Sequence, residues 1–167
     1  MGPIGPAQLS EWFDALAPPL VLYARQWMDA APAEDVVQDV FVRLMSQRKA
    51  PANPKGWLFR CVRNAAISHL RSRSRRRRHH ERLAAGGAAM FRPDPATAID
   101  AAAAQEALTE LPLELREVVV LRIWGQMKLR EIAEITGRPV STLMSRYQSA
   151  LEKIRQRMVQ PCKTKKT

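Results

Sequence analysis

The sequence predicts an all-α protein made of two small helical domains joined by a flexible linker. Apolar residues recur every three to four positions along most of the chain, which is the period of an α-helix. No useful stretch alternates as a β-strand does. A segment rich in glycine, proline and alanine, residues 83–104, separates two basic blocks, residues 1–82 and 105–167.

The charge balance indicates a polyanionic partner. The 167 residues include 27 Lys and Arg against 16 Asp and Glu, which gives a net charge of +11. A protein this basic usually binds nucleic acid. No stretch is long and apolar enough to cross a membrane, and the first residues do not resemble a secretory signal. We therefore expect a cytoplasmic nucleic-acid-binding protein.

Three helices are predicted in the N-terminal block. The first covers about residues 9–27 and is broken or bent at two adjacent prolines. The second begins near Asp35, and the third begins at Pro54 with Asn53 as its cap. The apolar stripe of the second helix is Val36, Val37, Val40, Phe41, Leu44 and Met45. That of the third is Trp57, Leu58, Cys61, Val62, Ala65, Ala66 and Leu70.

The C-terminal block has the pattern of a helix-turn-helix. After a helix at about residues 113–124, a short helix is predicted at 129–136. Gly137 ends the short helix, because glycine readily adopts the left-handed conformation found there. A longer helix follows from about Val140. Its predicted buried stripe is Leu143, Tyr147, Ala150, Leu151, Ile154 and Met158.

In a helix-turn-helix the long helix enters the major groove of DNA with its N-terminus first. The outward residues that would reach base edges are Ser141, Thr142, Ser145 and Arg146. Arginine can bind guanine at two points, and hydroxyl groups can donate or accept a hydrogen bond. The cations that would hold phosphates are Lys128, Arg130 and Arg138. The alternative is an ordinary helical hairpin with a solvated polar face.

The N-terminal block ends in a dense run of cations. Residues 71–82 contain seven arginines and two histidines, a composition that repels itself and favours phosphate. The run continues the outward face of the third helix, where arginines could follow single-stranded DNA while amide or aromatic groups receive bases. The residues concerned are Trp57, Arg60, Arg63, Asn64, Arg71, Arg73, Arg75 and Arg76. A core role for Trp57, and a solvated or RNA-binding arm for the run, are alternatives.

The second helix is unusual because its outward face is acidic and polar. Asp35, Gln38 and Asp39 lie opposite the apolar stripe, either simply solvated or as a docking surface for a basic protein. Cysteines, histidines and carboxylates do not cluster as in a metal, nucleophile or two-metal site. We therefore expect no metal, no cofactor and no enzymatic activity.

Together these motifs resemble the extracytoplasmic-function sigma factors of bacterial RNA polymerase. Residues 33–41, AEDVVQDVF, look like the acidic helix of sigma region two, and residues 57–71 look like its WLxxxxRNxxxDxxR helix. Residues 111–116, 131–134 and 141–146 look like the LPxxxR, EIAE and gTVkSRl motifs of region four. Four positions depart from the family pattern, namely Ser68, Pro139, Met144 and Ser149.

The resemblance implies that residues 1–82 are region two and residues 105–167 are region four. Region two would recognise and open the minus-ten element and would dock on the polymerase clamp through Asp35, Gln38, Asp39 and Phe41. Region four would read the minus-thirty-five element. Core RNA polymerase, promoter DNA and an anti-sigma factor would be the partners. The competing interpretation is a stand-alone helix-turn-helix regulator, which would bind a palindromic site as a dimer.

Overall fold

The structure is a computed structural model that describes residues 4–80 and 107–159, with side chains described to residue 72 in the first range and to residue 158 in the second. All regular structure in these ranges is helical, which confirms the predicted all-α class. The helices are α1 (Pro6–Ala24), α2 (Ala30–Met45), α3 (Pro54–His80), α5 (Leu113–Ile123), α6 (Leu129–Thr136) and α7 (Val140–Val159). The predicted linker, residues 83–104, lies outside the described residues.

The prolines do not break the first helix. α1 continues through Pro18 and Pro19, so of the two predicted alternatives the break is wrong. Two prolines remove only two backbone donors from a helix of 19 residues. The turn that follows them is anchored because Leu20 and Tyr23 are completely buried, and tertiary packing of this kind outweighs the local cost of proline.

The third helix begins with a side-chain cap, whereas the second begins without one. α2 starts at Ala30, five residues before the expected position, and Met45 at its end is 60% exposed and not part of the core. α3 begins at Pro54 as predicted, and the Asn53 side chain accepts a hydrogen bond from the Gly56 N–H at 2.9 Å. This hydrogen bond satisfies one of the free donors at the start of α3.

The predicted helix-turn-helix is present with its predicted bounds. Gly137 follows α6 with φ at +68°, the left-handed conformation expected of it. At the other end of α6, the Glu131 carboxylate accepts a hydrogen bond from the Lys128 N–H at 2.7 Å. The stripe of α7 is only partly as predicted, because Leu151 and Met158 are exposed. Ala150 and Ile154, on either side of Leu151 along α7, pack in the cluster with Val119 of α5, so Leu151 lies on a side of α7 that the cluster does not cover.

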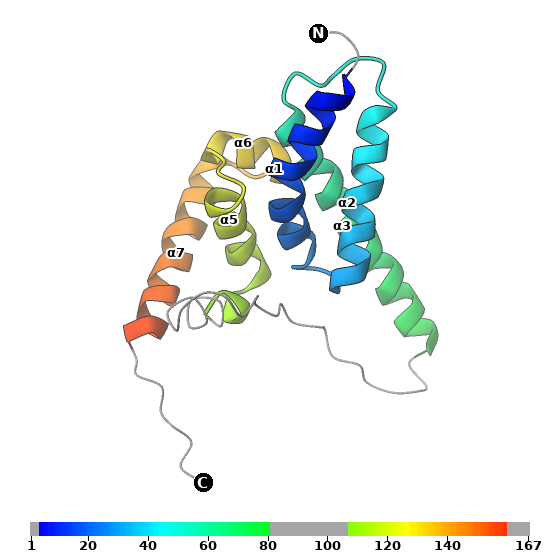
Figure 1. The fold of residues 1–167 in the computed structure, drawn as a ribbon. Coiled ribbons are helices and arrows are strands. Elements are labelled where there is room, and N and C mark those ends of the chain that lie inside the picture. The colour runs from blue at the N-terminus through cyan, green and yellow to red at the C-terminus, as the bar shows by residue number, and fades with distance from the viewer. Residues whose placement is uncertain (1–3, 81–106, 160–167) are drawn as a thin grey trace.

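The two helical groups share one continuous core. Figure 1 shows α1, α2 and α3 together, with α5, α6 and α7 beside them. α1 contacts α5, and α3 contacts α6. Buried residues of both groups, including Tyr23 and Phe59 from the first and Leu121 and Ile132 from the second, form a single cluster. The two predicted domains therefore lie against each other in this structure.

Candidate nucleic-acid interface

The outward face of α3 carries the first set of predicted DNA-binding residues. Arg60, Asn64 and Arg71 are exposed, and their spacing of four and seven residues places them on one side of the helix. Ser68 lies on the same side and is also exposed. The backbone is helical at Arg73, Arg75 and Arg76, but these side chains lie outside those that the structure describes.

Trp57 lies at the edge of this face. It is half-buried and packs against the shared core, so its packing supports the core interpretation. Cys61, one turn further along α3, is also half-buried. Burial raises the pKa of its thiol, although Arg43 and Arg60 act in the opposite direction. The protonated thiol behaves as a small apolar side chain.

Arg63 is paired with a carboxylate, whereas Arg60 and Asn64 beside it on α3 are exposed to solvent. Its Nε donates a hydrogen bond to Oε1 of Glu117 on α5 at 2.8 Å. The Tyr23 hydroxyl of α1 donates to the same oxygen at 2.7 Å. Burial and then the Glu117 charge hold the pKa of Tyr23 well above its usual range. Burial alone would lower the pKa of Arg63, but the hydrogen bond to Glu117, the charge of Glu117 and the neighbouring Tyr23 together raise it.

The N-terminal turns of α7 carry the second predicted set. Ser141 and Ser145 are exposed and Thr142 is half-buried, whereas Arg146 forms an ion pair with Glu114 of α5. The Ser145 hydroxyl donates to the Ser141 carbonyl at 3.1 Å. The side chain of Arg146 is only 19% exposed, so in this structure it braces α7 against α5.

Sequence reasoning did not select two exposed apolar residues on the same turns. Val140 and Met144 are about as exposed as each other, at 40% and 44%, and stand one helical turn apart. In the sequence Met144 is notable only as a departure from the family pattern. The feature that could have identified both residues is their position next to Ser141 and Ser145, which were predicted to contact bases. The cations expected at phosphates, Lys128, Arg130 and Arg138, are all exposed.

The predicted polymerase-docking face of α2 is also largely exposed. Asp35, Gln38 and Asp39 face solvent, but Phe41 is buried with its ring centroid 4.9 Å from that of Phe13. Phe41 belongs to the apolar stripe, so it supports the face from behind. Val42, which is 60% exposed and lies outside the predicted apolar stripe, adds an apolar residue to this face.

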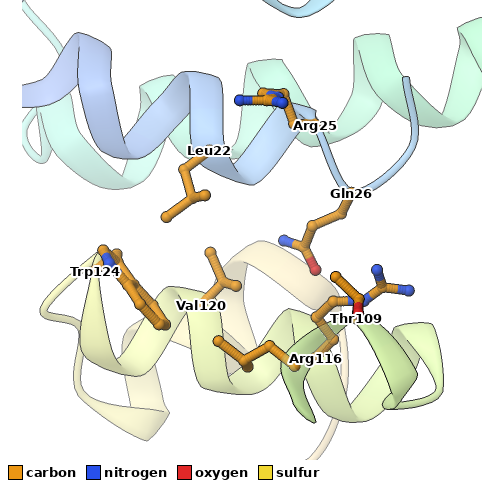
Figure 2. A pocket seen from close by; sticks show the side chains of 8 residues that line it. Leu22, Arg25, Gln26, Thr109, Arg116, Val120 and Trp124 are labelled. Atoms are coloured by element: carbon orange, nitrogen blue, oxygen red, sulfur yellow. The ribbon is translucent and has the colours of Figure 1, made fainter. Parts of the chain in front are cut away.

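A small cavity of about 40 Å³ lies between the two helical groups. Figure 2 shows Leu22 of α1, with Gln26 just after that helix, facing Arg116 and Val120 of α5 and Trp124 just after it. Both polar atoms of the Gln26 amide and the Arg116 Nε are buried without a hydrogen-bond partner. The cavity has room for a few water molecules beside these polar groups.

The described residues form a two-part helical protein with a helix-turn-helix and two exposed basic faces, which is typical of helical DNA-binding proteins. No group of His, Cys, Asp or Glu within the described residues is placed to hold a metal ion. None of the described helices is long and apolar enough to span a bilayer.

Comparison with known proteins identifies the family. A family model described as Sigma-70 region 2 matches residues 12–76, and one described as Sigma-70, region 4 matches residues 101–154. Together the two models match more than half of the chain. The chain belongs to the sigma-70 family of RNA polymerase sigma factors and is of the extracytoplasmic-function type.

Individual relatives agree with this membership. The chain is 30% identical over 153 residues to the RNA polymerase sigma-H factor of Pseudomonas aeruginosa, covering 81% of this chain and 77% of the relative. It is 29% identical over 130 residues to the sigma factor SigV of Bacillus subtilis, covering 74% of each. A crystal structure of the sigma factor RpoE from Bartonella quintana in complex with the anti-sigma factor NepR matches with a TM-score of 0.73. That match has 25% identity and covers 89% of this chain and 94% of the other.

Proposed function

We propose that this sigma factor divides promoter recognition between two regions and has no catalytic activity of its own. Residues 1–82 bind the polymerase clamp and open the minus-ten element, and residues 105–167 read the minus-thirty-five element. Residues 83–104 join them. The observation that carries the proposal is the presence of one exposed basic face in each matched region, on α3 and around the turn before α7. The protein acts beside polymerase in the cytoplasm.

The minus-ten element binds along the outward face of α3. Arg60 and Arg71 contact phosphates, and the amide of Asn64 between them hydrogen-bonds an unstacked base. Arg73, Arg75 and Arg76 extend the phosphate contacts along the same helix. Trp57 supports this face from its half-buried position and stacks on a base only if it leaves the core.

The minus-thirty-five element is read by the first two turns of α7. Ser141, Thr142 and Ser145 offer hydroxyl groups to base edges, while Val140 and Met144 offer apolar contact that suits the methyl group of thymine. Lys128, Arg130 and Arg138 hold the flanking phosphates and set the register. Arg146 reaches a guanine only if it leaves Glu114.

The exposed face of α2 docks on the polymerase. Asp35, Gln38 and Asp39 supply acidic and polar contacts, and Val42 supplies an apolar contact at the same surface. Interfaces combine a small apolar centre with polar groups around it, and this face has both. Phe41 keeps the face in place through the core. An anti-sigma factor is a further proposed partner, because the structural relative RpoE forms a complex with the anti-sigma factor NepR. By covering α2 or α7 such a partner would silence the protein.

Run-off transcription with purified core polymerase on a random-promoter library tests the proposal. The wild-type protein should direct specific transcripts, and Asn64→Ala should abolish them. Arg138→Ala should weaken them, while Lys153→Ala, which removes another exposed cation, on α7, should not. Tight binding to a palindromic site without polymerase, together with no transcription, would overturn the proposal in favour of a stand-alone regulator.

A further inference from the structure

Glu117 is the starting point because it is a buried carboxylate whose partners come from the other region. Only 7% of the residue is exposed. A buried carboxylate needs hydrogen-bond donors, since losing its hydration is costly. Oε1 receives both of its donors, the Tyr23 hydroxyl and the Arg63 Nε, from region two. The contact between the regions is therefore what makes the burial of Glu117 tolerable.

The same contact withdraws an arginine from the proposed minus-ten face. Arg63 stands on α3 next to the exposed Arg60 and Asn64, yet its side chain is 20% exposed and is paired with Glu117. A DNA phosphate and the Glu117 carboxylate are chemically similar partners for a guanidinium. Arg63 cannot form this ion pair with Glu117 and bind a DNA phosphate in the same way at the same time.

The promoter cannot be bound at both elements while the regions touch. The minus-ten and minus-thirty-five elements lie about 25 base pairs apart, or roughly 85 Å at about 3.4 Å per base pair. α3, with 27 residues, is only about 40 Å long. Since α3 contacts α6 and α6 leads directly into α7, both DNA-binding faces lie within a much shorter span. Binding both elements requires the regions to separate.

The contact is built in a way that permits separation. Beside the well-paired Glu117, the buried amide of Gln26 and the Nε of Arg116 have no partner within the protein and lie at a cavity between α1 and α5 that is large enough for water. Lys55 of α3 reaches the Gln126 carbonyl at a distance of 3.4 Å, which is long for a hydrogen bond. Glu117 therefore makes shorter polar contacts with region two than Lys55 makes with region four.

We propose that Glu117 is a latch that holds region four against region two in the free protein and competes with promoter DNA for Arg63. Polymerase and promoter open the latch by holding the two regions apart. The proposal rests on the proposed function, because it takes α3 as the minus-ten face.

Spin labels on the full-length chain test the latch directly. Labels are placed at Ser10→Cys on α1 and Gln148→Cys on α7, both exposed, after Cys61 and Cys162 have been changed to serine. The distance distribution between the labels should be short and narrow in the otherwise unchanged protein and should broaden to long distances in Glu117→Gln. Glu110→Gln, which removes an ion pair to Arg157 within region four, is the matched control and should stay closed.

Binding of a single-stranded minus-ten oligonucleotide to the free protein gives the second measurement. If the latch masks the face, Glu117→Gln should bind roughly tenfold more tightly than the wild type, since apparent affinity rises with the open fraction. Glu110→Gln should bind like the wild type. Tyr23→Phe, which leaves the Glu117 charge in place, should open the protein less than Glu117→Gln does.

The outcomes separate the latch from the proposed function. An unchanged distance distribution and unchanged oligonucleotide binding in Glu117→Gln, with native circular dichroism, would overturn the latch even if polymerase-dependent transcription is normal. If Glu117→Gln does not fold, an unchanged distance distribution in folded Tyr23→Phe overturns it instead. Failure of the wild-type protein to direct transcription would refute the proposed function, whatever the label distances show.

Discussion

Arg63 and Glu117 are 54 residues apart in the sequence, yet they form a hydrogen-bonded ion pair at 2.8 Å between α3 and α5. A second glutamate of α5, Glu114, pairs with Arg146 of α7. One short helix therefore neutralises an arginine from each of the two predicted DNA-binding faces. Because a carboxylate and a phosphate attract the same guanidinium, we expect α5 to oppose DNA binding at both faces if these arginines contact DNA as proposed.

The hydroxyl of Tyr23 should contribute measurably to stability. Tyr23→Phe removes one of the two donors to buried Glu117 and should lower the free energy of unfolding by about 2 kcal/mol, as expected for a hydrogen bond to a charged group. Tyr147→Phe, which alters a half-buried ring against the same core, should cost less. Urea denaturation measures both, and equal losses would argue against a special role for Tyr23.

Substitution of two asparagines, one just before α3 and one on it, should affect either stability or transcription but not both. Asn53→Ala removes the cap of α3 and should cost about 1 kcal/mol of unfolding free energy. Asn64→Ala changes an exposed residue and should leave stability within about 0.5 kcal/mol, but it should abolish transcription with core polymerase. Thermal unfolding and run-off transcription of the pair check this. Normal transcription by a stable Asn64→Ala protein would contradict the base contact.

The turn of the helix-turn-helix should depend on glycine. Gly137→Ala places a side chain at φ +68° and should cost about 1 kcal/mol, although no atom lies close enough to clash with the new Cβ. Gly5→Ala is the control, because its surroundings are equally open and its φ is −74°. Its loss of stability in chemical denaturation should be the smaller one. A Gly137→Ala protein as stable as the wild type would show that the turn tolerates Cβ.

Met144 should read thymine in the minus-thirty-five element. Replacing thymines of the element by deoxyuracil removes their methyl groups and should weaken holoenzyme binding by about 0.8 kcal/mol, or roughly fourfold, for each methyl group that Met144 covers. Met144→Ala should be insensitive to the replacement. Leu151→Ala, equally exposed but two turns further along α7, should respond as the wild type does. Fluorescence-based binding measures all three proteins, and sensitivity retained in Met144→Ala would rule out the thymine contact.

Local features of the protein were determined by the sequence alone. The start of α3 at Asn53 and Pro54 and the end of α6 at Gly137 were predicted correctly because a cap or a left-handed turn depends on a few adjacent residues. Periodicity also identified most of the buried positions. The division of the chain into two matched regions follows from motifs that are continuous in sequence.

Packing between helices was decided only by the tertiary structure. Burial of the turn after Pro19 keeps α1 whole, and Leu151 is exposed on α7 although Ala150 and Ile154 beside it are packed. The partner of Arg63 could not be predicted, because periodicity shows that a face is basic but not which carboxylate reaches it. In the sequence Glu117 looks like any other charged residue of a helix. It is buried only because region four packs on region two, and that packing depends on the shape of a core to which both regions contribute.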